Sequence, residues 1–154
     1  MDLDIDIIRK ADCPVGDGFL RSVVERTVAL SGGPSSVSRT RVALSVILTD
    51  DAEVRAMNRR HRDRDATTDI LSFPNFEGGA FEADPDGAVQ LGDLVLSVPF
   101  VVRSAEEDHV PFDREFAYIL SHGVLHLLGY DHSEAMFSLQ DAVTDGAASE
   151  DGVE

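Results

Sequence analysis

The stretch SHGVLHLLGYDH, residues 121–132, places three histidines within eleven residues. His122 and His126 are four residues apart, so on an α-helix they lie on the same face, one turn from each other. His132 follows six residues later, beyond Gly129, and glycine readily ends a helix in a left-handed turn. Such a turn can bring the third imidazole back toward the first two. The stretch therefore predicts a helix and turn that together form a metal site.

Three imidazoles without a fourth protein ligand are typical of an open, catalytic zinc site. A closed structural site would need another ligand, usually a thiolate, and the single cysteine, Cys13, is far from the histidines in the sequence. Neutral imidazoles leave the ion its full double charge, which lowers the pKa of a bound water to about 7. We expect one Zn²⁺ per chain at His122, His126 and His132, and nickel and manganese stay open.

The spacing H-x-x-x-H-x-x-G-x-x-H is also that of the metzincin proteases. Those enzymes carry a glutamate directly after the first histidine as general base, and this chain has Gly123 there. Peptide hydrolysis by that route is therefore disfavoured. Two nearby acids, Asp131 and Glu115, are expected either to orient an imidazole through a hydrogen bond or to be solvated surface groups.

Composition predicts a single globular domain. The chain has 154 residues, 43% of them hydrophobic, which is enough to bury a core. No apolar run reaches membrane-spanning length, and the first residues, MDLDIDII, carry acids where a signal peptide would carry bases. Together with the single cysteine, these features predict a cytoplasmic protein without a membrane segment.

The charge is strongly negative overall but locally positive. A net charge of −16 argues against a nonspecific nucleic-acid coat protein. Within residues 54–64, VRAMNRRHRDR, lie five of the 13 basic side chains: Arg55, Arg59, Arg60, Arg62 and Arg64. The remainder of the molecule is strongly acidic, so this cluster is a local exception.

Hydrophobic periodicity gives the element order β-α-β-α-β-β-α-α-α. The expected strands are 3–9, 41–48, 67–73 and 91–97, the second of them central and covered on both faces. The expected helices cover 16–30, the arginine cluster after a cap at Asp50, the segment after a cap at Ser97, the first two histidines after Pro111, and 133–143. In the last helix the side chains expected to face inward are Met136, Phe137, Leu139 and Val143.

These elements predict an α/β (α+β) fold. We expect one catalytic domain over residues 1–143, with a mixed sheet of about four strands packed by about five helices. Residues 75–90 are rich in glycine and aspartate and predict a long loop. Residues 144–154, TDGAASEDGVE, are acidic and small and predict a disordered tail.

The run HGVLHLLGYDH closely resembles the signature of the YbeY family of bacterial metal-dependent endoribonucleases, which take part in ribosomal RNA maturation and ribosome quality control. MNRRHRDRDATTDILSFP, residues 57–74, resembles the family's arginine followed by a T-[DN]-[VI]-L-S-F-P strand. LGDLVLS, residues 91–97, resembles the strand that comes next. The likeness spans roughly residues 3–143 and leaves the acidic end outside.

The resemblance implies that His122, His126 and His132 are the zinc ligands and that Arg62 is the arginine on which activity depends. It implies an endoribonuclease that cuts single-stranded RNA near the 3′ end of small-subunit ribosomal RNA, with the small ribosomal subunit as partner. An arginine is always charged, and its planar fork suits a phosphate, so Arg62 is expected to stabilise transition-state charge. Zinc hydroxide and a ribose hydroxyl both stay open as nucleophile.

The chain departs from the family pattern at two positions. His61 stands where an aromatic is usual, and we expect it to fill that position; Thr67 stands where a proline is usual. Two other functions stay open: a metallopeptidase-like zinc hydrolase, disfavoured by Gly123, and a ribosome assembly factor that cuts weakly or not at all. We expect a monomer that does not act on DNA.

Overall fold

A four-stranded mixed sheet forms the centre of the fold in the computed structural model, which describes residues 2–32, 41–77 and 80–153, with side chains up to residue 147. The strands are β1 (Leu3–Arg9), β2 (Arg41–Thr49), β3 (Ile70–Pro74) and β4 (Ala88–Ser97). Their order across the sheet is β1-β2-β4-β3. Strands β1, β2 and β4 run parallel, and β3 pairs antiparallel with β4 at the edge. The predicted mixed α/β sheet is confirmed.

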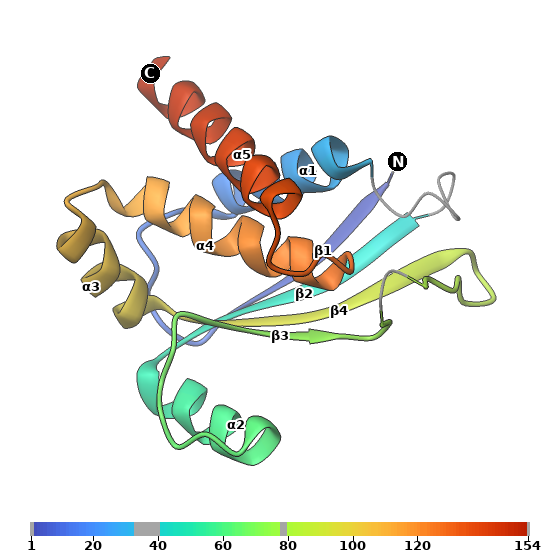
Figure 1. Cartoon of the computed structure of the whole chain (residues 1–154), viewed down its shortest axis with the longest axis horizontal. Helices are drawn as coiled ribbons and strands as arrows, with labels where there is room; N and C mark the ends of the chain where they lie inside the picture. The colour runs from blue at the N-terminus through green and yellow to red at the C-terminus, as the bar shows by residue number, and fades with distance from the viewer. Residues whose placement is uncertain (1, 33–40, 78–79, 154) are drawn as a thin grey trace.

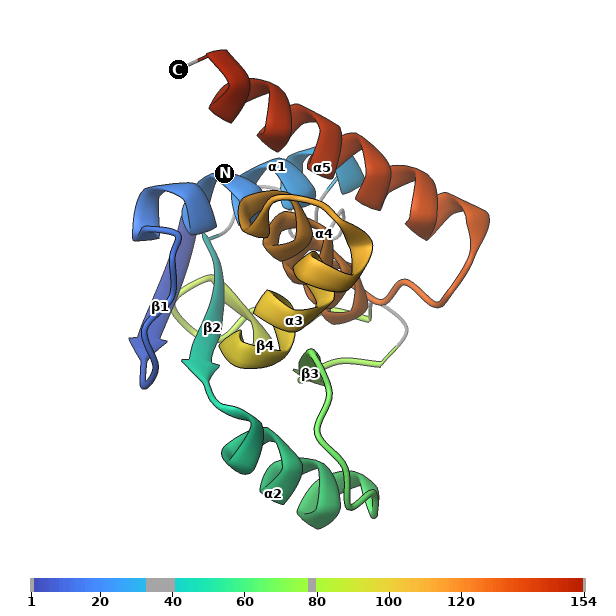
Figure 2. The ribbon, with the colours of Figure 1, turned by 90° about the vertical axis from the view of Figure 1, so that its left-hand side faces the viewer.

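Five helices lie in the described part of the chain, in the predicted order. Helices α1 (Asp17–Ser31), α4 (Phe112–Leu127) and α5 (Glu134–Val153) lie over one face of the sheet, whereas α2 (Asp51–Arg62) lies on the other side (Figures 1 and 2). Helix α3 (Val98–Asp108) packs against α4 and β4 at one end. None of the described helices combines the length and apolarity needed to cross a membrane.

Strand β2 is central, as predicted, but only one of its faces is fully covered. Val42, Leu44, Val46 and Leu48 alternate along the strand and are buried beneath the helices. The residues between them, over 43–47, remain partly exposed on the opposite face. Helix α2 covers that face at one end only. The prediction that β2 is covered on both faces is therefore right for one face and wrong for most of the other.

Helix α2 packs through a small apolar cluster of its own. Val54 is fully buried against Val95 and Leu71, with Met57 and Phe73 beside them. The predicted cap is confirmed, because the Asp50 carboxylate accepts a hydrogen bond of 3.0 Å from the backbone N–H of Glu53. The cap and the cluster together fix the direction of α2, so that its last turn, which carries arginines, reaches past the edge strand.

The boundaries of β3 and β4 differ from the predicted ones. Strand β3 begins at Ile70, whose N–H donates to the carboxylate of Asp69 at 2.7 Å, while the carbonyl of Asp69 accepts from the Ser97 N–H of β4 at 2.9 Å. Strand β4 begins at Ala88, inside the predicted loop, because Asp84 bonds Ala88 through both its backbone N–H and its carboxylate. Residues 78–79 of that loop lie outside the described residues, as do 33–40 after α1.

Helix α5 continues to Val153, so the structure has a helix over residues 144–153, where the sequence predicts a disordered tail; residue 154 lies outside the described residues. Val143, Thr144 and Ala147 are buried where α5 packs on α1 and α4, so the amphipathic pattern does not stop at residue 143. The sequence suggested disorder from small and acidic residues, but alanines favour a helix wherever one face is covered. Phe137 also departs from its predicted inward position, since its side chain is 42% exposed.

Gly123 lies where α4 packs tightly on the sheet. A methyl group at this position would lie 2.5 Å from Cδ1 of Ile70 and 2.9 Å from Cδ2 of Leu94. Both distances are shorter than non-bonded carbon atoms tolerate. The absence of a side chain at Gly123 therefore allows the helix with the histidines to pack directly on β3 and β4.

We expect Gly123→Ala to lower the free energy of unfolding by about 1–3 kcal/mol relative to Gly18→Ala, because the added methyl overpacks the interface. Gly18 is the matched control: it is also helical, but nothing lies within 4 Å of its added methyl. The gain in helix propensity therefore largely cancels between the two variants. Urea denaturation measures the free energy of unfolding of both variants. Equal values for Gly123→Ala and Gly18→Ala would contradict the close packing at Gly123.

Candidate metal centre and substrate cleft

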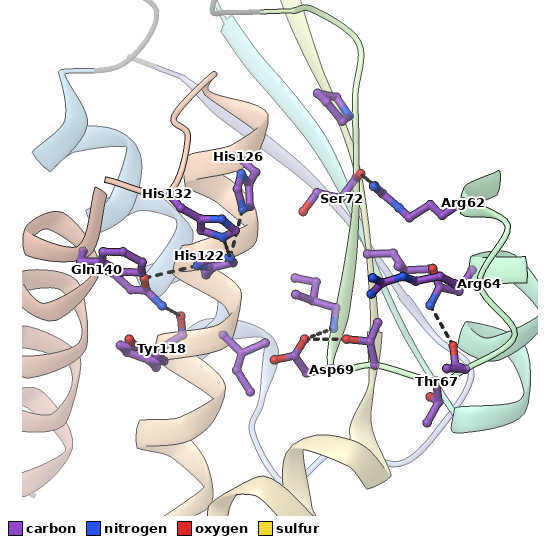
Figure 3. Close-up of a pocket in the computed structure, with 18 residues that line it drawn as sticks. Arg62, Arg64, Thr67, Asp69, Ser72, Tyr118, His122, His126, His132 and Gln140 are labelled. Carbon is purple, nitrogen blue, oxygen red and sulfur yellow. Dashed lines mark hydrogen bonds between the residues drawn. The ribbon is translucent and has the colours of Figure 1, made fainter. Parts of the chain in front are cut away.

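The three predicted histidines converge on one point. His122 and His126 project from successive turns of α4, and the chain then turns at Gly129, whose φ of 94° is left-handed. The Nε2 atom of His122 lies 3.0 Å from Nε2 of His126 and 3.3 Å from Nε2 of His132. Each histidine offers one ligand nitrogen, and these three atoms lie within 4.8 Å of one another. Figure 3 shows the three rings together on one wall of a cleft.

Hydrogen bonds at the far side of two rings determine their tautomers. Nδ1 of His126 donates to the backbone carbonyl of Tyr130 at 3.0 Å. Nδ1 of His122 lies 3.3 Å from Oε1 of Gln140, whose amide nitrogen donates to the carbonyl of Tyr118 at 3.0 Å. A neutral imidazole carries one proton, so both Nε2 atoms present lone pairs to each other.

Facing lone pairs repel unless a cation lies between them, and this arrangement fits a metal. Burial lowers the pKa of both His122 and His126, which favours the neutral ligand form near pH 7. With Zn–N bonds of about 2.0–2.1 Å, tetrahedral geometry separates two ligand nitrogens by about 3.3–3.4 Å. The separations of 3.0 and 3.3 Å at His122 are close to this value. The three histidines can therefore bind a metal ion with little rearrangement.

Gln140 on α5 is the contact that sequence reasoning missed. It is 1% exposed and joins His122 to the backbone of α4. The two acids suggested for this purpose do not perform it: within the described residues, neither Asp131 nor Glu115 hydrogen-bonds a histidine. Burial, with Asp108 nearby, instead raises the pKa of Glu115 to about 7. Gln140 lies on another helix, so no spacing within the histidine stretch could have indicated it.

The opposite wall of the cleft is basic. The cleft has a volume of about 840 Å³, and its lining includes all three histidines together with Arg62 and Arg64. In Figure 3 the arginines extend from the end of α2 and the segment after it, and the strand that carries Ser72 lies between them and the histidines. Arg62 donates to the carbonyl of Ser72 and places its guanidinium 5.5 Å from the ring centre of Phe73. The structure thus brings Arg62 and the histidines to one cleft.

The departures from the family pattern have simple structural accounts. His61 packs edge-to-face on Phe73 with 5.3 Å between ring centres, so it fills the aromatic position as expected. Thr67 donates to the carboxylate of Asp51 at 3.1 Å, which ties the segment after α2 back to the start of that helix. A salt bridge from Arg103 to Asp51 lowers the pKa of this carboxyl.

The other arginines of the cluster do not line the cleft. Arg55 is paired with Asp65 at 2.8 Å on the surface. Arg59 and Arg60 are exposed on α2 and absent from the cleft lining. Arg62 and Arg64 are therefore the members of the predicted cluster that face the histidines.

Comparison with known proteins identifies the family. The chain matches the family model described as Endoribonuclease YbeY over residues 10–146. It belongs to this family. A protein from Moorella thermoacetica named Endoribonuclease YbeY is 40% identical over 146 residues, covering 90% of this chain and 92% of its own. One of the same name from Persephonella marina is 41% identical over 138 residues, covering 85% and 83%.

The fold is also that of a solved structure. The solution structure of TM1509 from Thermotoga maritima matches with a TM-score of 0.61 and 26% identity, covering 95% of this chain and 90% of that one. The family match extends beyond residue 143. It therefore agrees with the continuation of α5 past the predicted domain boundary.

Gly123 distinguishes this chain from the proteases with the same histidine spacing. The Cβ of a glutamate in this position would lie 2.5 Å from Cδ1 of Ile70 and 2.9 Å from Cδ2 of Leu94, so the glutamate could not be accommodated without displacing these side chains. Among the described residues that line the cleft, the acidic side chain is Asp69, on the loop before β3. The residue that supplies the general base in metzincins thus has no counterpart on α4.

We expect Gln140→Leu to weaken zinc binding about 10- to 100-fold, because His122 loses the acceptor that fixes its tautomer. Leucine keeps most of the buried volume, so the fold should persist. Competition with a chromogenic chelator measures the affinity, and circular dichroism checks the helices. The control is Ser138→Ala, which changes an exposed residue of the same helix. Unchanged zinc affinity in Gln140→Leu would contradict the role assigned to this contact.

Proposed function

We propose that this protein is a zinc-dependent endoribonuclease that cuts single-stranded RNA during maturation of the 3′ end of small-subunit ribosomal RNA. The observation that carries the proposal is the placement of three converging imidazoles opposite Arg62 and Arg64 in one cleft. Neutral ligands on one wall and fixed positive charge on the other suit a phosphodiester, which is negatively charged. Membership of the YbeY family supports the same activity.

In this proposal His122, His126 and His132 hold one Zn²⁺ and leave one coordination position open. When bound, zinc supplies Lewis acidity, which makes a hydroxyl nucleophile available near neutral pH. The donor set of three nitrogens favours zinc over magnesium or calcium, which prefer oxygen ligands.

Arg62 binds the non-bridging oxygens of the scissile phosphate and stabilises the charge that builds on them. Its side chain at the end of α2 is held by its hydrogen bond to the carbonyl of Ser72. A guanidinium has five N–H donors, so the bond to Ser72 leaves donors that can face a phosphate. Arg64 provides a second positive charge along the same wall.

The overall charge bears on how the RNA arrives. With a net charge of −16, the protein as a whole repels RNA, whereas Arg62 and Arg64 place positive charge at the cleft. We therefore infer that the small ribosomal subunit presents the RNA to the cleft. The cytoplasmic location and the monomeric state stay predictions from the sequence.

Arg62→Ala should lower kcat for cleavage of a single-stranded RNA of the small-subunit 3′ end about 100- to 1,000-fold, because one transition-state contact is lost. Zinc content should not change, since Arg62 makes no hydrogen bond to the histidines, and helix content should not change, since its ring contact, Phe73, is only partly buried beside the α2 cluster. Arg59→Ala is the matched control on the same helix and should cleave like the wild type. Full activity in Arg62→Ala would overturn the phosphate role.

The same preparations distinguish the alternative functions. Degradation of casein that depends on zinc, without RNA cleavage, would support the metallopeptidase. A wild type that binds zinc and ribosomes but cuts no RNA would support the assembly factor. In that case Arg62→Ala would weaken ribosome association, and α2 would be a docking surface.

A further inference from the structure

Two exposed aromatic side chains lie on the histidine wall of the cleft. The described residues include four exposed large hydrophobic side chains, which are Ile8, Leu30, Tyr118 and Phe137. Tyr118, 37% exposed, and Phe137, 42% exposed, both line the cleft beside the histidines. The chain has eight phenylalanines, two tyrosines and no tryptophan, and among the described residues the two of these rings that are exposed both occur at this site.

The position of Phe137 is fixed by its backbone. Its N–H bonds the carbonyl of Ser133 at 3.0 Å in the first turn of α5, and the preceding residue, Met136, is fully buried in the core. The Phe137 ring lies parallel to that of His132, with 5° between their planes and 6.1 Å between their centres. Core packing thus anchors the helix while this ring stays accessible next to a candidate metal ligand.

Tyr118 is held on the other side of the same wall. It lies one turn before His122 on α4, and its backbone carbonyl accepts the amide of Gln140. Figure 3 shows Tyr118, Gln140 and His122 in a row on this wall, opposite Arg62 and Arg64. The cleft therefore has one charged wall and one wall with flat apolar surface, and both adjoin the point where the histidines converge.

This division matches the two parts of an unpaired nucleotide. The phosphate is an anion, whereas the base has two flat faces that stack on aromatic side chains when the strand is single. A base within a duplex already stacks on its neighbours and does not offer these faces. Stacking of one base on an aromatic ring strengthens binding about 5- to 150-fold.

We propose that Phe137, with Tyr118 on the same wall, is the platform on which a base next to the scissile phosphate stacks, and that this contact selects unpaired RNA. The inference rests on the proposed function, because the arginine wall is taken to hold the phosphate. It assigns specificity to two residues that touch the base, separate from the residues that act on the phosphate.

The test is a double-mutant cycle in which a side chain of the enzyme and a base of the substrate are removed separately and together. The probes are a fluorescent unpaired 10-nucleotide RNA and versions in which one nucleotide beside the mapped cut is abasic. Phe137→Ala should raise KM for the intact RNA about 5- to 100-fold with kcat little changed, and Phe137→Trp should restore KM. On one abasic RNA, the wild type and Phe137→Ala should have the same KM, because the base that stacks is already missing. Leu30→Ala, exposed outside the cleft, is the control and should match the wild type.

Three results would overturn the inference. One is an unchanged KM in Phe137→Ala on intact RNA. Another is an equal loss on intact and every abasic RNA, which would mean that no base is involved. The third is a loss of zinc from Phe137→Ala, which would mean that the ring serves to position His132.

Fluorescence anisotropy of the same RNAs keeps this inference distinct from the proposed function. If the wild type binds RNA with the expected dependence on the base and on Phe137 but does not cut it, the nuclease proposal fails and the platform stands. If the wild type cuts RNA but Phe137→Ala has the same effect on intact and abasic RNA, the platform inference fails and the nuclease proposal stands. If it neither binds nor cuts, both fail.

Discussion

The site depends on imidazole nitrogens that face one another with lone pairs and no proton between them. His122 and His126 each donate a hydrogen bond from Nδ1–H to a protein acceptor. Their Nε2 atoms are therefore unprotonated and lie 3.0 Å apart, so that their lone pairs repel each other. A protein keeps such an arrangement only if the surrounding packing holds it or a cation relieves it. The fold supplies the packing, and the nitrogen donors are those that zinc prefers.

Three packing features hold this geometry. Gly123 lets α4 lie directly on the sheet, and the left-handed turn at Gly129 returns the chain so that His132 meets the other rings. Gln140 reaches from α5, whose buried residues extend past position 143 onto α1. The length of α5 therefore matters to the metal centre, because this helix carries both the partner of His122 and the ring of Phe137.

Function requires the second wall, which comes from a different part of the chain. Helix α2 lies on the opposite side of the sheet from α4, and its last turn passes the edge strand to bring Arg62 into the cleft (Figure 2). In an otherwise acidic protein, this placement concentrates positive charge at one site. This arrangement suits the proposed substrate, whose phosphate is an anion for the arginine wall and whose unpaired base is a flat group for the wall with the histidines.

The sequence predicted the parts of the site that are local and missed those that arise between elements. The spacing of the histidines and the glycine after them predicted their convergence, because both follow from the geometry of one helix and one turn. The helix cap at Asp50 could likewise be predicted from the sequence. Gln140 and the exposed Phe137 were not, because each depends on how α5 docks on α4, and helical periodicity alone did not distinguish an inward Phe137 from a ring at the cleft.

The measurement that tests the central claim most directly is X-ray absorption at the zinc edge of the zinc-loaded protein. The account predicts one zinc per chain, with three imidazole nitrogens at about 2.0–2.1 Å and one further light atom from solvent. The account would be contradicted by a sulfur ligand at about 2.3 Å or by a fourth protein side chain that closes the site. It would also be contradicted if the protein bound no zinc when one equivalent of the metal was added.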